Sequence, residues 1–178
     1  SLIDLNFLDV RFDMVFEPLD NYTASGVDHA YFIISTNVGE DMKPLWQVAS
    51  GGELSRIMLA MKSCLAEVDR IETLIFDEID VGISGRTAQM VAEKIHAIAQ
   101  NHQVICITHL PQIAAMASQH YLIEKQVIDG KTVTNIYPLD ETQQVNELAR
   151  LIGGVEITET VLQSAKEMKE LAIKAKVD

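Results

Sequence analysis

The sequence predicts an α/β fold, and three patterns support this. Two short apolar runs, 73–76 and 104–107, are each followed by a segment with helical periodicity, as parallel strands joined through helices require. A glycine turn at 50–53 introduces the first long helical segment. Apolar residues make up 48% of the 178 residues, which suits a globular chain with a sizeable core. The length predicts one domain, or one lobe of a larger one.

The first third of the chain predicts a pair of strands. Apolar and polar side chains alternate over 10–16, as in a half-buried strand, and 31–35 form the second strand. Pro18 and Gly26 bound a polar segment that predicts a connecting loop. A second loop is expected over 37–44, before Trp46.

The central part predicts two helices, two strands and a short helical turn. The first helix is expected from Ser50 to about Val68, and its apolar face comprises Leu54, Ile57, Met58, Met61 and Leu65. After the strand at 73–76, Ser84 is the expected N-cap of a helix that reaches 100, with Val91, Ile95 and Ile98 on one face. The second strand covers 104–107, and Pro111 suits the first turn of a helix ending near 118.

The last third predicts a hairpin and two helices. Strands at 120–125 and 132–138 are joined by an Asp129-Gly130 turn. One helix has Val145, Leu148, Ala149 and Ile152 on its apolar face and ends at Gly153-Gly154. The other has Val161, Ala165, Met168 and Ala172 on one face, with acid near its start and lysines near its end.

Charge and cysteine content narrow the classes of function. The net charge is -12, from 26 acidic and 14 basic residues, and such a surface repels DNA phosphates and anionic membranes. If the protein works on nucleic acid, the basic contact surface is expected on another segment or subunit. Cys64 and Cys106 lack metal-ligand spacing and are expected as buried thiols in a reducing compartment. The sequence contains no signal peptide and no run long enough to span a bilayer, and its start at Ser1 suggests a fragment.

The Ser50-Gly51-Gly52-Glu53 turn has two interpretations. It matches a capping box, in which Ser50 and Glu53 satisfy backbone donors at a helix start. A cap does not require the two glycines, each of which costs about 1 kcal/mol relative to alanine inside a helix. Close approach of the backbone to an anion at a helix N-terminus does require small residues. The turn is therefore a candidate anion site as well as a cap.

Polar residues follow both predicted parallel strands. Asp77 and Glu78 end the first, and His109 follows the second. Ligands of open α/β sheets gather at this strand end, where one carboxylate can hold a hard cation and the other can polarise a water. A histidine there can contact phosphate or orient water. The alternatives are a solvated loop for the carboxylates and a carbonyl cap for His109.

These segments together resemble ABC-type ATPases of the SMC-like branch. Residues 48–56, VASGGELSR, resemble the signature motif, and 73–78, TLIFDE, the Walker B strand; 81–84 lie at the D-loop position and 107–109 resemble the switch histidine, or H-loop. The phrases FDEIDVGISG and ITHLPQIAAMA resemble bacterial DNA repair proteins within that branch. The phosphate-binding Walker A motif, Gly-x-x-x-x-Gly-Lys-Ser/Thr, is absent from the sequence.

The resemblance implies a role for each site residue. Asp77 helps to hold Mg²⁺, Glu78 polarises the attacking water, and His109 contacts the γ-phosphate of ATP. Ser50, Gly51 and Gly52, with Glu53 and Ser84 in the same nucleotide-binding set, face ATP held by a second head. Two departures stand out. Glu53 replaces the glutamine usual in transporters, and Ser84 lies where many ABC proteins have aspartate, which leaves the contact at that position open.

The same resemblance implies an organisation. The chain is expected to be the C-terminal half of an ATPase head, with a strand pair over 1–45, the motif core over 46–138 and C-terminal helices over 139–178. Its expected partners are the Walker A segment of the same protein, a second head in a homodimer, and DNA through the full-length protein. No membrane partner is expected, and the location is cytoplasmic and nucleoid-associated. The alternatives are another SMC-like or transporter ATPase, or a non-catalytic dimerisation module.

Overall fold

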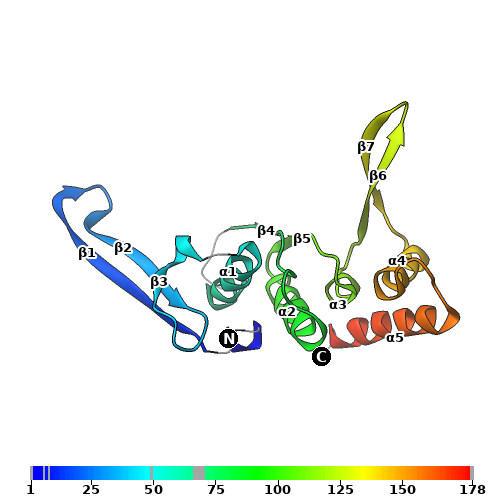
Figure 1. Ribbon diagram of the computed structural model, residues 1–178, viewed down its shortest axis with the longest axis horizontal. Coiled ribbons are helices and arrows are strands. Elements are labelled where there is room, and N and C mark those ends of the chain that lie inside the picture. Colours follow the sequence, from blue (N-terminus) through cyan, green and yellow to red (C-terminus); the bar gives the residue numbers. More distant parts are fainter. Residues whose placement is uncertain (1, 6, 8, 49, 66–70, 177–178) are drawn as a thin grey trace. The chain divides into compact units, whose positions relative to one another are not determined.

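The computed structural model describes residues 2–5, 7, 9–48, 50–65 and 71–176 (Figure 1). The chain divides into two compact units. The first unit comprises Ser1–Ile83 and Asn101–Ile107, and the second comprises Ser84–Gln100 and Thr108–Asp178.

An antiparallel sheet begins the first unit. After a 3-10 turn, η1 (Ile3–Leu5), strands β1 (Arg11–Thr23) and β2 (Gly26–Ser35) pair in the order β1-β2-β3, with β3 being Lys43–Pro44. The predicted pair is confirmed, but the loop expected from Pro18 to Gly26 is wrong in extent. The strand continues through Pro18, with a register shift before Thr23, because β1 is an edge strand, where proline is tolerated.

The loop expected over 37–44 is also shorter than predicted. Its last two residues, Lys43–Pro44, pair with Ile33 and Ile34 of β2 as β3. A single turn of 3-10 helix, η2 (Leu45–Gln47), follows.

Two parallel strands carry the carboxylate segment. β4 (Thr73–Phe76) matches its predicted bounds. β5 (Gln103–Cys106) begins and ends one residue earlier than predicted. Leu74 lies opposite Val104, and Phe76 lies opposite Cys106. Side chains alternate between faces: Leu74 and Phe76 are buried, whereas Ile75 is 67% exposed.

Helix α1 (Gly51–Leu65) forms where the glycine turn predicts it. Its expected end near Val68 lies outside the described residues. The predicted apolar face is wrong, since of its members only Ile57 is buried, and Leu54 and Leu65 are exposed. The face that packs inward consists of Gly52, Arg56, Ile57, Leu59 and Ala60. It is displaced because Gly52 and Arg56 lie against the turn that follows β4.

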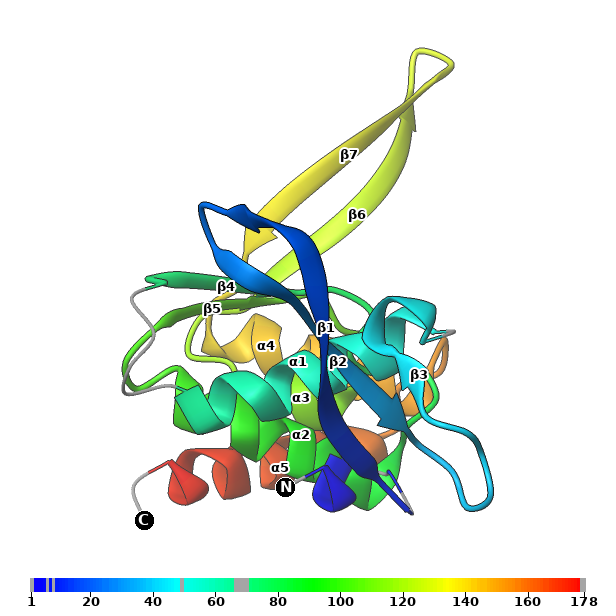
Figure 2. The same ribbon diagram turned by 90° about the vertical axis from the view of Figure 1, so that its left-hand side faces the viewer.

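The second unit contains the remaining helices and the second hairpin. It holds α2 (Gly85–Ile98), α3 (Pro111–Ala115), β6 (Tyr121–Ile128), β7 (Lys131–Pro138), α4 (Glu141–Gly153) and α5 (Glu159–Ala175). Figure 2 shows β6 and β7 as a twisted two-stranded ribbon. The predicted Asp129-Gly130 turn is confirmed, with φ of 50° and 74°, the left-handed pair that such hairpin turns need.

The fourth helix ends where the sequence predicts, and the fifth runs between the predicted acid and lysines. Asp140 and Gln143 form a reciprocal capping box at the start of α4, and Gly154, with φ 71°, ends it. Thr158 caps α5 through its side chain. Leu148 and Ala149 of α4 and Ala165 and Ala172 of α5 are buried in the core of this unit.

The α/β fold class predicted from the sequence is confirmed. The strands in the described part of the chain form three separate sheets, of which β4–β5 is parallel and the other two are antiparallel. Among these residues, no helix combines the length and apolar character needed to cross a membrane.

Candidate functional site

The glycine turn caps helix α1. The Ser50 hydroxyl Oγ accepts a hydrogen bond from the Glu53 amide at 3.1 Å, and the Ser50 carbonyl accepts one from the Leu54 amide at 3.1 Å. The capping interpretation is therefore correct for Ser50. Gly51 is exposed and Gly52 is buried, so the backbone of the first turn is open on one side only.

The two carboxylates follow β4 in a tight turn. Asp77 and Glu78 are both exposed, and Asp77 Oδ1 accepts a hydrogen bond from the Glu78 amide at 3.0 Å. Glu78 has φ 56°, a left-handed conformation that costs a non-glycine residue on the order of 1 kcal/mol. The Val81 amide donates to the Glu78 carbonyl at 3.1 Å, and Ile79 beneath the turn is fully buried. Glu78 is therefore held in a strained, well-anchored position.

The start of α1 lies directly against this turn. A Cβ built on Gly51 would stand 2.5 Å from Glu78 Oε2, so the carboxylate lies beside the positive end of the helix. A Cβ on Gly52 would stand 2.9 Å from the Glu78 carbonyl oxygen and 3.0 Å from that of Val81. The glycines are thus needed for close approach of two backbone segments within one chain. The first unit thereby brings the turn at 50–53 together with Asp77 and Glu78.

The two remaining predicted residues lie in the second unit. Ser84 is the N-cap residue of α2, as predicted, but its hydroxyl makes no capping bond. The α2 start is held by the Ser84 carbonyl instead, which accepts from the Thr87 amide at 3.2 Å. The Ser84 side chain is exposed.

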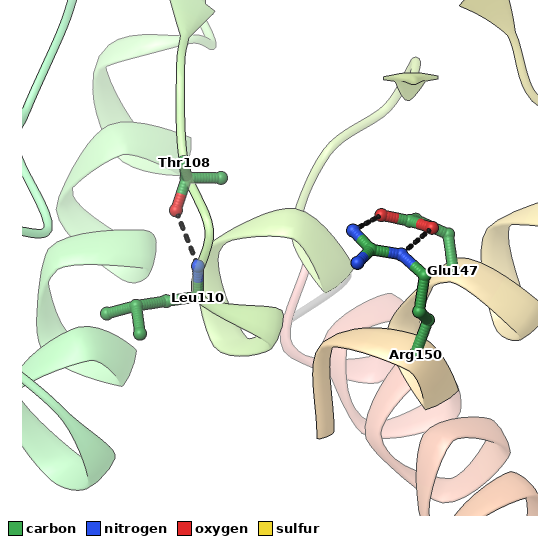
Figure 3. A network of polar contacts seen from close by, with 4 residues as sticks. All are labelled: Thr108, Leu110, Glu147 and Arg150. Atoms are coloured by element: carbon green, nitrogen blue, oxygen red, sulfur yellow. Dashed lines mark hydrogen bonds and ion pairs between the residues drawn. The ribbon is translucent and has the colours of Figure 1, made fainter. Parts of the chain in front are cut away.

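His109 is exposed and lies two residues before α3. The residue before it is fixed locally, because the Thr108 hydroxyl accepts a hydrogen bond from the Leu110 amide at 3.0 Å (Figure 3). Pro111 at the first helical position of α3 confirms the predicted helix start. The same view shows Arg150 bonded through two nitrogens to Glu147 on α4.

The acidic residues of the site suit a metal ion that is held only partly by the protein, with phosphate oxygens and waters as its other ligands. Within the described ranges no cluster of three or more His, Cys, Asp or Glu side chains could hold an ion alone. Mg²⁺ commonly takes one or two carboxylates, several waters and substrate phosphate oxygens. An exposed Asp77 carboxylate at a strand end suits that mode of binding.

The cysteines differ from each other. Cys64 is exposed, so the expectation that both thiols are buried is wrong for this residue, which lies on the outer face of α1. Cys106 is half-buried on β5, and burial, with smaller contributions from Asp80 and Asp77, raises the pKa of its thiol from 9.0 to about 12.

Sequence reasoning missed the α1 residues that hold the turn. Ser55 Oγ donates to the Asp77 carbonyl at 2.8 Å, and the buried Arg56 donates to the Val81 carbonyl at 2.8 Å. A usable signal exists, since Arg56 stands four residues after Gly52 and shares its helix face.

Comparison with solved structures identifies the fold first. The fold is similar to that of a solved Smc head domain with a coiled coil and joint from Pyrococcus yayanosii, with a TM-score of 0.55 and 23% identity, covering 82% of this chain and 26% of that one. The glycine turn, the strand-end carboxylates and the histidine segment are thus displayed on the fold of an SMC-type head.

Sequence comparison then narrows the family. The chain is 50% identical over 154 residues to the DNA repair protein RecN of Bacillus subtilis, covering 86% of this chain and 27% of the relative. It is 45% identical to RecN of Haemophilus influenzae, with 86% and 27% covered, and 39% identical to RecN of Deinococcus radiodurans, with 93% and 29% covered. The chain belongs to the RecN family and corresponds to the C-terminal part of its members. It spans somewhat more than a quarter of the length of these relatives, and no family model matches it.

Proposed function

We propose that this chain is the C-terminal part of an ATPase head in a RecN-like protein that acts in recombinational repair of DNA double-strand breaks. In the full-length protein the head binds ATP with Mg²⁺ and hydrolyses it. Hydrolysis requires the Walker A segment of the same protein and a second head in a homodimer. The protein contacts DNA through surfaces outside this chain, in the cytoplasm at the nucleoid, since the net charge here is -12.

The observation that carries the proposal is the position of Glu78. It follows a parallel strand, in a strained turn whose exposed carboxylate is backed by the start of α1. Parallel sheets place ligand chemistry at this strand end. A fixed carboxylate there can polarise a water for attack on phosphorus, and positioning with charge stabilisation supplies most phosphoryl-transfer catalysis.

One face of the β4–β5 pair is exposed, which supports the proposal that a further segment of the protein covers it. Parallel sheets are ordinarily covered on both faces, yet Ile75 is 67% exposed and Ile105 is 46% exposed on the same face of this pair. Relatives that are about three times as long as this chain contain sequence that can cover such a face. We propose that the Walker A segment docks there and completes the sheet.

Within this proposal each site residue has one role. Asp77 would hold Mg²⁺ through water, and the bound metal would neutralise negative charge on the phosphates. Glu78 accepts a proton from the attacking water, and His109 contacts the γ-phosphate. ATP bound by the partner head is faced by the glycine turn and the D-loop serine, namely Ser50, Gly51, Gly52, Glu53 and Ser84.

Replacement of Glu78 by glutamine in the intact protein tests the proposal. We expect kcat for ATP hydrolysis to fall by about 100-fold or more, because the general base is lost, while ATP affinity stays within about twofold. The ATP-bound pair of heads should persist longer in size-exclusion chromatography. Unchanged hydrolysis and unchanged pairing would instead indicate a dimerisation module without catalysis.

Reconstitution tests the division of the site between segments. The chain alone should hydrolyse no ATP, and activity should appear when it is mixed with the N-terminal segment. As a control, the mixture is repeated with Glu78→Gln. Robust turnover by the lone chain would contradict a divided site.

A further inference from the structure

Arg56 is an unusual residue of the first unit. Its side chain is 4% exposed, and its guanidinium stands 5.5 Å from the ring centre of Phe7. Burial lowers its pKa, while the nearby Glu53 raises it. Placing a cation in the interior is costly compared with an apolar side chain of similar volume. Its retention here therefore calls for a contact that only a strong donor can make.

The contacts of Arg56 are with the backbone of the turn after β4. Its Nη1 donates hydrogen bonds to the Val81 carbonyl at 2.8 Å and to the Ile79 carbonyl at 3.4 Å. Its Nε is buried without a hydrogen-bond partner in the part of the chain that the structure describes. The guanidinium is thus directed at the main chain on the C-terminal side of Glu78.

Ser55 holds the other side of the same turn. Its hydroxyl donates to the Asp77 carbonyl at 2.8 Å. Two consecutive residues of α1 therefore fix the carbonyls that flank Glu78, whose own carbonyl is bonded to the Val81 amide. The left-handed Glu78 backbone costs free energy and persists only when its surroundings hold it.

We propose that Arg56 is a positioning residue that fixes the 77–81 turn against the start of α1, and so sets the place of the Glu78 carboxylate relative to the glycine turn. Any shift of the glycine turn on binding a ligand is transmitted through Arg56 to the water-polarising carboxylate. This inference rests on the proposed ATPase function, but its structural part does not depend on activity.

The first test measures the turn directly. Hydrogen exchange of the intact protein is compared between wild type, Arg56→Met and Arg56→Lys. In Arg56→Met we expect exchange at the Val81 amide to accelerate about tenfold, with exchange in α4 unchanged. Arg56→Lys should restore most of the protection, because an ammonium can reach one carbonyl. Arg150→Met removes an exposed arginine of the second unit, and exchange at the Val81 amide should stay at the wild-type rate in this control. Unchanged exchange at Val81 in Arg56→Met would overturn the proposal.

The second test separates positioning from nucleotide binding. In Arg56→Met, kcat should fall about tenfold to 100-fold while KM for ATP stays within about twofold, and Arg56→Lys should recover most of kcat. A raised KM with unchanged kcat would overturn the proposal. If Arg56→Met does not fold, Ser55→Ala takes its place and should both accelerate exchange at the Val81 amide and lower kcat. Wild-type exchange and kcat in Ser55→Ala would overturn the proposal. If the wild type hydrolyses no ATP, the proposed function fails, and the exchange result alone decides the role of Arg56.

Discussion

Alanine substitutions at Gly51 and Gly52 should separate stability from catalysis. Neither glycine has a left-handed φ, so the effect of a methyl group depends on the helix and on the space around it. Alanine improves helix propensity by about 1 kcal/mol at either position. At Gly52 the methyl would meet the backbone oxygens of Glu78 and Val81 at 2.9 and 3.0 Å, and these cannot withdraw without moving the turn.

Gly52→Ala should therefore be less stable than Gly51→Ala. Overpacking against backbone costs about 1–3 kcal/mol, which leaves Gly52→Ala less stable than wild type by about 0–2 kcal/mol. At Gly51 the methyl meets only Glu78 Oε2 at 2.5 Å, and this flexible carboxylate must withdraw by about 0.9 Å to reach ordinary contact at 3.4 Å. Gly51→Ala should keep or gain stability, yet a displacement near 1 Å can cost about 100-fold in rate.

Thermal unfolding and single-turnover ATP hydrolysis of the intact protein measure both effects. Gly153→Ala serves as a control, because its methyl meets only Val161 side-chain atoms at 3.0 Å in the second unit and should leave hydrolysis unchanged. The reasoning would be refuted by a Gly52→Ala protein more stable than Gly51→Ala, or by a Gly51→Ala protein with wild-type hydrolysis.

Four further predictions concern the rest of the molecule. Leu148→Ala should lower the free energy of unfolding by about 2–5 kcal/mol in urea titration, since Leu148 is fully buried, and a loss below about 1 kcal/mol would contradict this. Asp140→Ala should lower the free energy of unfolding by about 1 kcal/mol in the same assay, because the α4 capping box is lost. Asp140→Asn should keep most of that stability. Lys169→Met should cost about 1–2 kcal/mol, because Lys169 Nζ donates to the Ala115 and Ala117 carbonyls at 3.1 and 3.3 Å; an unchanged midpoint would show these bonds to be dispensable. Burial raises the Cys106 pKa from 9.0 to about 12, so its stabilising contribution is complete below pH 9 and is lost as pH rises toward 12. Iodoacetamide at pH 9 should modify Cys64 well before Cys106, as peptide mass spectrometry would report, and equal rates would contradict the raised pKa.

Local sequence determined much of the fold. β4 lies within its predicted bounds because three consecutive apolar residues, Leu74 to Phe76, between polar neighbours define a short strand. The β6–β7 turn follows from Asp129-Gly130, whose left-handed φ values few other residue pairs accept. Helix α4 (Glu141–Gly153) is bounded by its caps, Asp140 before it and Gly154 after it. Each of these features depends on neighbours a few residues apart.

Other features needed the tertiary structure. The inward face of α1 includes Arg56 rather than the apolar stripe through Leu54, because the helix packs by Gly52 against a turn some 25 residues later in the chain. The passage of β1 through Pro18 depends on its place at a sheet edge. The Ser84 cap depends on its carbonyl and not on its hydroxyl.

For the candidate site, the sequence by itself supplied the glycine turn, Asp77, Glu78 and His109 and the chemistry that they can perform. Only the tertiary structure placed the Glu78 carboxylate beside Gly51 and showed that Ser55 and Arg56 hold the turn between them. Residue type and spacing fix which bonds a side chain can make. Which partner it meets depends on contacts between segments distant in sequence, and these are settled by packing the whole unit.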